Sequence, residues 1–252
     1  MARLRSPDFV PRLLQAAARV FARNGLKRAR VADIAREMGV AHGSLYNYVE
    51  SKEALFLLLV ERWGHLDSDL ANRELPIRTP SMQDIVERLR QRVDDTFPLP
   101  ALDAALSRRR PASPGRELEG VVRELFVRTE ESREGATILE RSALDVPELY
   151  HLFFEQVRRG LFDRMTRYVA MRMQDGDFQM GEPAVTARFI IETVTFFARH
   201  RHLDPDPQSL NDHTVRNSII GLVTRSLTLA ADDDRHNHPK RPTRRATTRT
   251  RI

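Results

Sequence analysis

The sequence contains no cysteine, and this absence excludes several kinds of chemistry. Without a thiol there is no disulfide framework, no cysteine nucleophile and no cysteine-ligated zinc or iron–sulfur site. Long apolar runs are also missing, since the longest, Ala54–Val60, is far shorter than the roughly 20 residues that a membrane-spanning helix needs. Residues Met1–Ser6 lack the apolar region of a secretion signal. We therefore expect a cytoplasmic protein with no membrane partner.

The sequence is equally poor in signals for β-structure and for catalysis. Polar and apolar residues seldom alternate over the length of a strand, and no segment reads as a β-hairpin. There is no phosphate-binding glycine loop and no nucleophile motif around any serine. Glu148 and His151 form a single Glu-x-x-His pair, whereas a di-iron bundle needs two. We therefore expect no enzyme activity, no metal site and no cofactor.

What the sequence does contain is helical periodicity along most of its 252 residues. A first helix is expected to begin near Asp8, which can act as N-cap, and to end at Gly25, which can take the positive φ of a helix C-terminus. The proline-rich residues 99–115 are expected to form a loop, with at most one helical turn near 101–106. The expected helices cover about residues 8–24, 31–38, 42–48, 51–75, 81–97, 116–131, 135–144, 147–174, 182–201 and 210–231.

Positive charge is concentrated at the two ends of the chain. Residues 1–62 hold 11 Lys and Arg against 6 Asp and Glu, and residues 232–252 hold 7 against 3. The whole chain carries +6, so the residues between the two ends are mildly acidic. Basic ends indicate contact with a polyanion, although solubility accounts for the same pattern. The final segment has almost no apolar residues and is expected to be disordered.

Residues 30–49, RVADIAREMGVAHGSLYNYV, have the spacing of a helix-turn-helix. The small side chain of Ala35 lets a second helix cross the first closely, and Gly39 supplies the positive φ of the turn. The two helices would share a core of Ile34, Met38, Val40 and Leu45. The second helix is then left with an outward face made mostly of polar residues.

That outward face suits the major groove of DNA, where base edges present distinct donors and acceptors. An amide there can pair with adenine, hydroxyl and imidazole groups can bond bases or phosphates, and a glycine permits close approach. The next helix begins at Ser51-Lys52-Glu53, whose free N–H groups form an anion site together with the lysine. The same spacing also fits an ordinary helical hairpin with a solvated polar face. The candidate DNA-binding residues are His42, Gly43, Ser44, Tyr46, Asn47 and Lys52.

At these residues the sequence resembles a known family. FARNG, followed by VADIAREMGVAHGSLYNYVESKEALF, resembles the N-terminal domain of the TetR family of transcriptional regulators, over about 60 of the 252 residues. The resemblance implies a helix-turn-helix domain, a helical body, a two-fold dimer and an inverted-repeat operator on double-stranded DNA. Three positions depart from the family pattern, which bears on the operator sequence and not on the fold: Ala29-Arg30, Ala41-His42 and Val49.

The expected architecture is all-α, with a DNA-binding domain and a larger helical domain. The DNA-binding domain is expected to cover residues 7–67, with its helix-turn-helix at about 30–49. The helical domain is expected to cover residues 68–231 and to serve effector binding and dimerisation, and a disordered basic tail covers residues 232–252. The helices at about 182–201 and 210–231 are apolar over most of their girth, so each is expected to be buried on two sides. With the resemblance, this pattern predicts a homodimer through these two helices.

Aromatic and methionine residues recur at helical spacing between residues 150 and 173. Core packing or dimer contacts account for this pattern without any ligand. The resemblance implies in addition that some aromatic side chains line a pocket for a small-molecule effector, whose identity the sequence does not give. The candidate pocket residues are Trp63, Phe126, Tyr150, Phe153, Phe154 and Tyr168.

Together these observations predict a sequence-specific DNA-binding regulator that works in the cytoplasm, at the nucleoid. The favoured hypothesis is a repressor that a small molecule releases from an inverted-repeat operator. One alternative is a protein of the same fold without a small-molecule effector, which organises the chromosome or responds to a protein partner. A second alternative, an all-α enzyme, has no catalytic constellation to support it.

Overall fold

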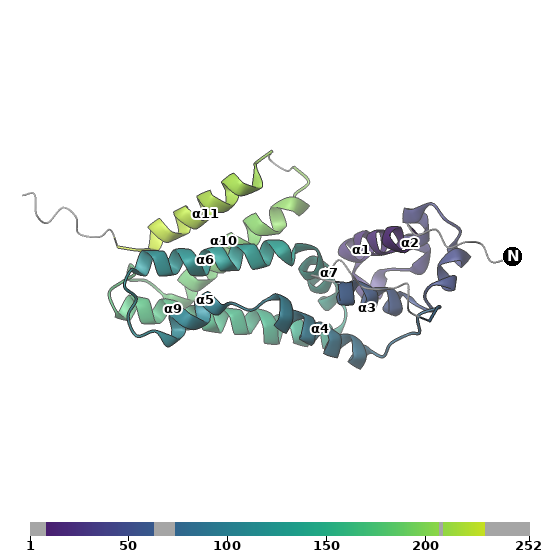
Figure 1. Ribbon diagram of the computed structural model, residues 1–252, viewed down its shortest axis with the longest axis horizontal. Coiled ribbons are helices and arrows are strands. Elements are labelled where there is room, and N and C mark those ends of the chain that lie inside the picture. The colour runs from purple at the N-terminus through teal and green to yellow at the C-terminus, as the bar shows by residue number, and fades with distance from the viewer. Residues whose placement is uncertain (1–8, 63–73, 207–208, 230–252) are drawn as a thin grey trace, which may run out of the picture.

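The computed structural model describes residues 9–62, 74–206 and 209–229, and within them every regular element is a helix. Figure 1 shows a small N-terminal head joined to an elongated body. This confirms the predicted all-α fold. The predicted N-cap Asp8, the pocket candidate Trp63 and the basic tail lie outside the described residues.

The elements are α1 (Phe9–Arg28), α2 (Val31–Met38), η1 (His42–Asn47), α3 (Lys52–Arg62), α4 (Met82–Thr96), α5 (Pro100–Ser107), α6 (Pro114–Glu131), α7 (Arg133–Ala143), α8 (Pro147–Tyr150), η3 (His151–Arg158), α9 (Arg159–Gln174), α10 (Pro183–Ala198), η4 (His200–Leu203) and α11 (Asp212–Leu227).

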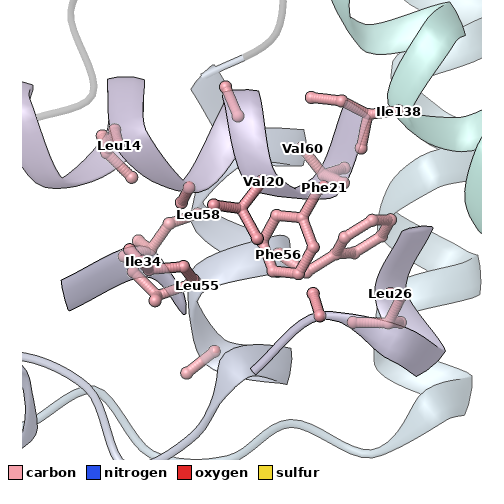
Figure 2. Packing of buried hydrophobic residues seen from close by; sticks show 14 of the residues in the cluster. Leu14, Val20, Phe21, Leu26, Ile34, Leu55, Phe56, Leu58, Val60 and Ile138 are labelled. Carbon is pink, nitrogen blue, oxygen red and sulfur yellow. The ribbon is translucent and has the colours of Figure 1, made fainter. Parts of the chain in front are cut away.

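The head consists of α1, α2, η1 and α3 around one apolar core. Phe21 of α1 and Phe56 of α3 meet edge to face, with ring centroids 5.4 Å apart. Figure 2 shows these two rings at the centre, with Ile34 of α2 on one side and Ile138 of α7 on the other. Because Ile138 belongs to the body, the core of the head is completed by a body helix.

The body is built on α6, α9, α10 and α11, which enclose a second apolar core. Its polar centre is Arg172 of α9, whose side chain is 0% exposed. The guanidinium bonds Glu117 at the start of α6 and the carbonyl of Ala105 near the end of α5, at 2.8 and 2.9 Å. One buried cation therefore joins α5, α6 and α9.

Three elements differ from the sequence-based expectations. The expected loop after residue 99 contains an eight-residue helix, α5, because Pro100 stands at the first helical position, where its missing N–H costs nothing. The expected helix 42–48 is a 3-10 helix. The expected helix 147–174 is interrupted by a π-helix, η3, over His151–Arg158. Within the described residues, no helix is long and apolar enough to cross a membrane.

The joint between head and body is formed by α1 and α7. At Gly25 the chain has φ 70° and ψ 172°, which ends the regular part of α1 as predicted and turns Leu26 into the core. The N–H of Leu26 donates to the hydroxyl of Ser142, at 3.0 Å, and that hydroxyl donates to the carbonyl of Ile138, at 2.7 Å. Arg141 adds a bond to the carbonyl of Arg23, at 3.1 Å. The end of α1 is therefore joined to α7 by one buried hydrogen bond, from Leu26 to Ser142, and one exposed hydrogen bond, from Arg141 to Arg23.

Replacing Gly25 with alanine is expected to lower the free energy of unfolding by about 1–3 kcal/mol, because this backbone conformation is open essentially to glycine alone. An added Cβ would also lie only 2.8 Å from the carbonyl oxygen of Arg141. Urea denaturation measures the change. The matched control is Gly120→Ala in α6, where an added Cβ meets nothing within 4 Å. Because alanine favours a helix more than glycine does, this control should raise the free energy of unfolding by about 0.5–1 kcal/mol. Equal effects of the two substitutions would contradict the close packing of α1 on α7.

Candidate nucleic-acid interface and internal cavity

The turn between α2 and η1 is closed by Gly39, which has φ 69° and ψ 33°. The N–H of Val40 bonds the carbonyl of Ala35 at 3.0 Å, and that of Gly39 bonds Arg36 at 3.1 Å. These bonds satisfy the carbonyls at the end of α2 and fix the direction in which the chain leaves it. The predicted positive φ at Gly39 is confirmed, and the position of η1 relative to α2 is tightly defined.

The outward face of η1 brings five of the six candidate DNA-binding residues together. His42, Gly43, Tyr46 and Asn47 are exposed and Ser44 is half-buried, while Leu45 of the same helix points into the core. A 3-10 helix has three residues per turn, so the side chains of Ser44 and Asn47 lie one above the other. The rings of His42 and Tyr46 are in contact, with centroids 5.2 Å apart. The result is a short polar ridge on which the ring of Tyr46 is also exposed.

The sixth candidate, Lys52, takes a place that the sequence did not indicate. Its ammonium donates to the carbonyls of Lys27 and Ala29, at 2.8 and 3.2 Å, and so ties the start of α3 to the connection between α1 and α2. Ser51 caps α3 by accepting from the N–H of Ala54 at 3.2 Å. An ammonium has three donors, so one N–H of Lys52 is left for an anion next to the start of α3.

Sequence reasoning missed a segment that returns to the head before α4. The backbone of Ile77 pairs with the stretch after η1, donating to the carbonyl of Tyr48 at 2.8 Å and accepting from Glu50 at 2.9 Å. The N–H of Thr79 donates to the carboxylate of Glu50 at 2.9 Å. Arg78, between the paired residues, is exposed. These contacts join residues 27 to 29 positions apart and leave no periodic signal in the sequence.

Residues 13–59 match the sequence model of a family described as "Bacterial regulatory proteins, tetR family". The chain is a TetR-family transcriptional regulator. The matched residues run from the first buried leucine of α1 into α3, so they cover the whole helix-turn-helix. None of the curated proteins compared matches the chain.

Solved structures share the fold of this TetR-family chain at low sequence identity. The ketosteroid transcriptional regulator KstR2 of Mycobacterium tuberculosis is 20% identical, with a TM-score of 0.55, and the match covers 90% of this chain and 98% of that one. A bacterial regulatory protein of the tetR family from Rhodococcus RHA1 is 16% identical, with a TM-score of 0.50, over 90% and 100% of the two chains. At these identities the likeness concerns the fold alone.

The body of this regulator contains a cavity of about 120 Å³ between α4, α6, α7, η3, α9 and α10. Of the predicted pocket residues, Phe153 lines it. Phe126 and Tyr168 lie in the apolar core of the body, whereas Tyr150 is exposed and contacts Phe154 in a tilted arrangement, with ring centroids 4.9 Å apart. The structure therefore does not bring the six candidates together, and only Phe153 among those described reaches the cavity wall.

The polar part of the cavity wall is a pair of arginine–carboxylate contacts that the sequence did not reveal. Arg199 donates to Glu140 at 2.7 Å, and Arg158 donates to Glu192 at 2.6 Å. Burial lowers the pKa of Arg199, and the nearby positive charge of Arg158 lowers it further, against the opposing effect of Glu140. No periodic pattern marks these residues, because they come from α7, η3 and α10.

Helix α7 takes part in both sites. One face, with Ala136, Leu139 and Glu140, lines the cavity. Another face, with Ile138 and Ser142, holds the end of α1 in the head. Helix α7 therefore contacts α1, and α1 in turn packs on α2 of the helix-turn-helix.

Proposed function

We propose that this TetR-family regulator is a dimeric repressor that binds an inverted-repeat operator and leaves it when a small molecule fills the body cavity. The observation that carries the proposal is the double role of α7, which lines the cavity on one face and holds the head on another. A ligand that shifts α7 changes the distance between the two heads of a dimer, and both heads then no longer fit adjacent major grooves. The protein would act in the cytoplasm, at the nucleoid.

In this proposal the polar ridge of η1 lies in the major groove. Asn47 pairs with a base, His42 and Ser44 bond bases or phosphates, and Gly43 lets the helix approach closely. Tyr46 and the free N–H of Lys52 bond phosphates, which fix the register without reading sequence. Exposed Arg78 follows Ile77, which pairs with the stretch after η1, and Arg78 would add a phosphate contact at the edge of the half-site.

The cavity also bears on the alternative of a regulator without a small-molecule effector. In such a protein the middle of the body would be expected to be close-packed, without a cavity lined by charged pairs. A partly open cavity with polar and apolar walls, next to the helix that holds the head, instead favours control by a small molecule.

Asn47→Ala is expected to weaken operator binding by roughly 1–3 kcal/mol and to relax preference at one base position per half-site. Selection of bound duplexes from a randomised pool measures both quantities, and the wild type should return an inverted repeat. The matched control is Lys52→Ala, which should weaken all duplexes about equally. If Lys52→Ala shifted base preference and Asn47→Ala did not, η1 would not be the reading helix.

A further inference from the structure

Resting on the proposed function, we infer the chemical class of the effector: an elongated amphiphile with an unbranched apolar chain and one polar end. The end of the chain would lie in the body cavity, and the rest would extend into a second hollow beside it. The inference rests on the walls that the two hollows share, on the pairing of charges around the body cavity and on the space beside Gly160.

The second hollow, called the outer hollow below, has a volume of about 450 Å³ and is bounded by α4, α5, η3 and α9. Four of its wall residues also line the body cavity: Val93, Phe97, Val157 and Leu161. All four are apolar, and each is only half-buried. An apolar chain can therefore pass from one hollow to the other along apolar groups, without taking a polar group out of water.

The two hollows lie on neighbouring faces of the same helical stretch, η3 followed by α9. Phe153 and Arg158 line the body cavity alone, whereas Gln156 and Gly160 line the outer hollow alone. Val157 stands between these faces and lines both hollows. A ligand that occupies both would therefore lie across one ridge of this stretch, which requires a long and narrow molecule.

The charged groups around the body cavity already have partners in the protein. Arg199 and Arg158 each donate to a glutamate, at 2.7 and 2.6 Å, and Arg92 donates to the carbonyl of Glu61 at 2.6 Å. A charge on the ligand would have to break one of these contacts or stay without a partner, and both cost free energy. The end of the ligand that enters this cavity should therefore be uncharged and apolar.

The volume of the body cavity limits how much of the ligand it can hold. At about 120 Å³ it is smaller than the engineered apolar cavity, about 150 Å³, that takes up benzene in another protein. It should therefore hold roughly six carbon atoms. A longer chain has to continue into the outer hollow, whose exposed residues Arg90 and Asp94 suit the polar end of the molecule.

Gly160 leaves room in the outer hollow and offers a way to fill it. An added Cβ at this position of α9 would meet nothing within 4 Å. A larger side chain would therefore extend into the outer hollow without a clash, and the body cavity, which Gly160 does not line, would keep its shape.

The first experiment measures how affinity depends on the length of the chain. Titration calorimetry on the full chain should show affinity rising roughly tenfold or more from 1-hexanol to 1-octanol and again to 1-decanol, as expected for two more buried methylenes at each step. Binding of none of the three, or no gain beyond 1-hexanol, would overturn the inference, since a compact ligand in the body cavity alone would then suffice.

A pair of charged probes tests the apolar end. Decanoate can leave its single charge in the outer hollow, whereas decanedioate has to bring a second charge into the body cavity. Decanedioate should therefore bind at least tenfold more weakly than decanoate. Equal binding of the two would contradict an apolar inner end.

Substitutions at two glycines locate the chain. Gly160→Leu should weaken 1-decanol at least tenfold and leave 1-hexanol unchanged, which also shows that the variant is folded. The matched control is Gly120→Leu in α6, where an added Cβ also meets nothing within 4 Å, and it should change neither affinity. If Gly160→Leu does not fold, Gln156→Trp, at an exposed position of the outer hollow, replaces it. Undiminished binding of 1-decanol by the folded variant would overturn the inference.

Operator binding in the presence of the same probes separates this inference from the proposed function. If 1-decanol binds in a way that Gly160→Leu weakens and the operator stays bound, the chemical class is right and release by an effector is wrong. If 1-hexanol releases the operator as well as 1-decanol does, and Gly160→Leu changes neither, release is right and the chemical class is wrong.

Discussion

Leu222→Glu is expected to convert the protein from dimer to monomer and to lower operator affinity by about 100-fold or more. A single head on a half-site has only the affinity of non-specific binding, with a Kd of roughly 10⁻⁴–10⁻⁶ M, whereas linked heads reach roughly 10⁻⁸–10⁻¹¹ M. A glutamate buried in an apolar interface has no partner for its charge, so the dimer should dissociate while each protomer stays folded.

The reason for choosing Leu222 is the apolar face that α10 and α11 leave uncovered. Val185, Phe189 and Phe196 of α10 and Leu222 of α11 are all exposed large apolar residues. Figure 1 shows these two helices along one edge of the body, with α11 packed on α6 and α10 and no other described helix on its outer side. Scattered apolar residues are normal on a surface, but a row on two adjacent helices indicates an interface.

A control of equal exposure is available elsewhere on the chain. Leu144 at the end of α7 is 55% exposed and Leu222 is 56% exposed, so Leu144→Glu makes the same change outside the α10–α11 face. Sedimentation velocity should show Leu144→Glu as a dimer and Leu222→Glu as a monomer. A wild type that sediments as a monomer at micromolar concentration would refute the interface.

Arg172→Met should lower the free energy of unfolding by about 3–5 kcal/mol, the usual result of removing one partner from a buried ion pair. The side chain of Glu117 is only 6% exposed and loses its main partner in this variant, while the carbonyls of Ala105 and Arg108 lose their donors. A methionine fills the space of the arginine stem but donates no hydrogen bond, so the loss is electrostatic and not steric.

Two comparisons test that account of Arg172. Arg123→Met removes an exposed pair with Glu119 on α6, which should cost less than about 1 kcal/mol. The double variant Arg172→Met/Glu117→Leu removes both charges and should recover much of the stability lost in the single variant. Urea denaturation measures all three. Failure of the double variant to recover stability would show that the hydrogen bonds to the α5 carbonyls, and not the ion pair, hold this end of the body.

The head was predictable from the sequence because its determinants are local. The positive φ at Gly25 and Gly39 and the buried spacing of Ile34 and Leu45 all follow from residues a few positions apart. The body was predictable only as a set of helices. Apolar residues on α10 do not say which face is outward, and the structure places Ile191 in the core and Phe189 outside.

The cavity lay beyond sequence reasoning for a physical reason. Its charged wall joins Glu140 on α7, Arg158 on η3 and Arg199 after α10, three places up to 59 residues apart in the chain. Pairing between such residues depends on how the helices pack, and each arginine taken alone resembles an ordinary surface residue. The candidate pocket residues were chosen for aromatic character, whereas aromatic side chains such as Tyr168 fill the core.

The buried hydroxyl of Ser142 also bears on how the head would move if a ligand shifted α7, as in the proposed function. Ser142 is 0% exposed, and its oxygen is the acceptor for the N–H of Leu26. A small displacement of α1 would break that bond without letting water reach the N–H, which costs free energy. Under the proposed function the head would therefore follow α7 as one unit and would not rotate against it. A graded response of transcription would then reflect the fraction of protomers with α7 in each position.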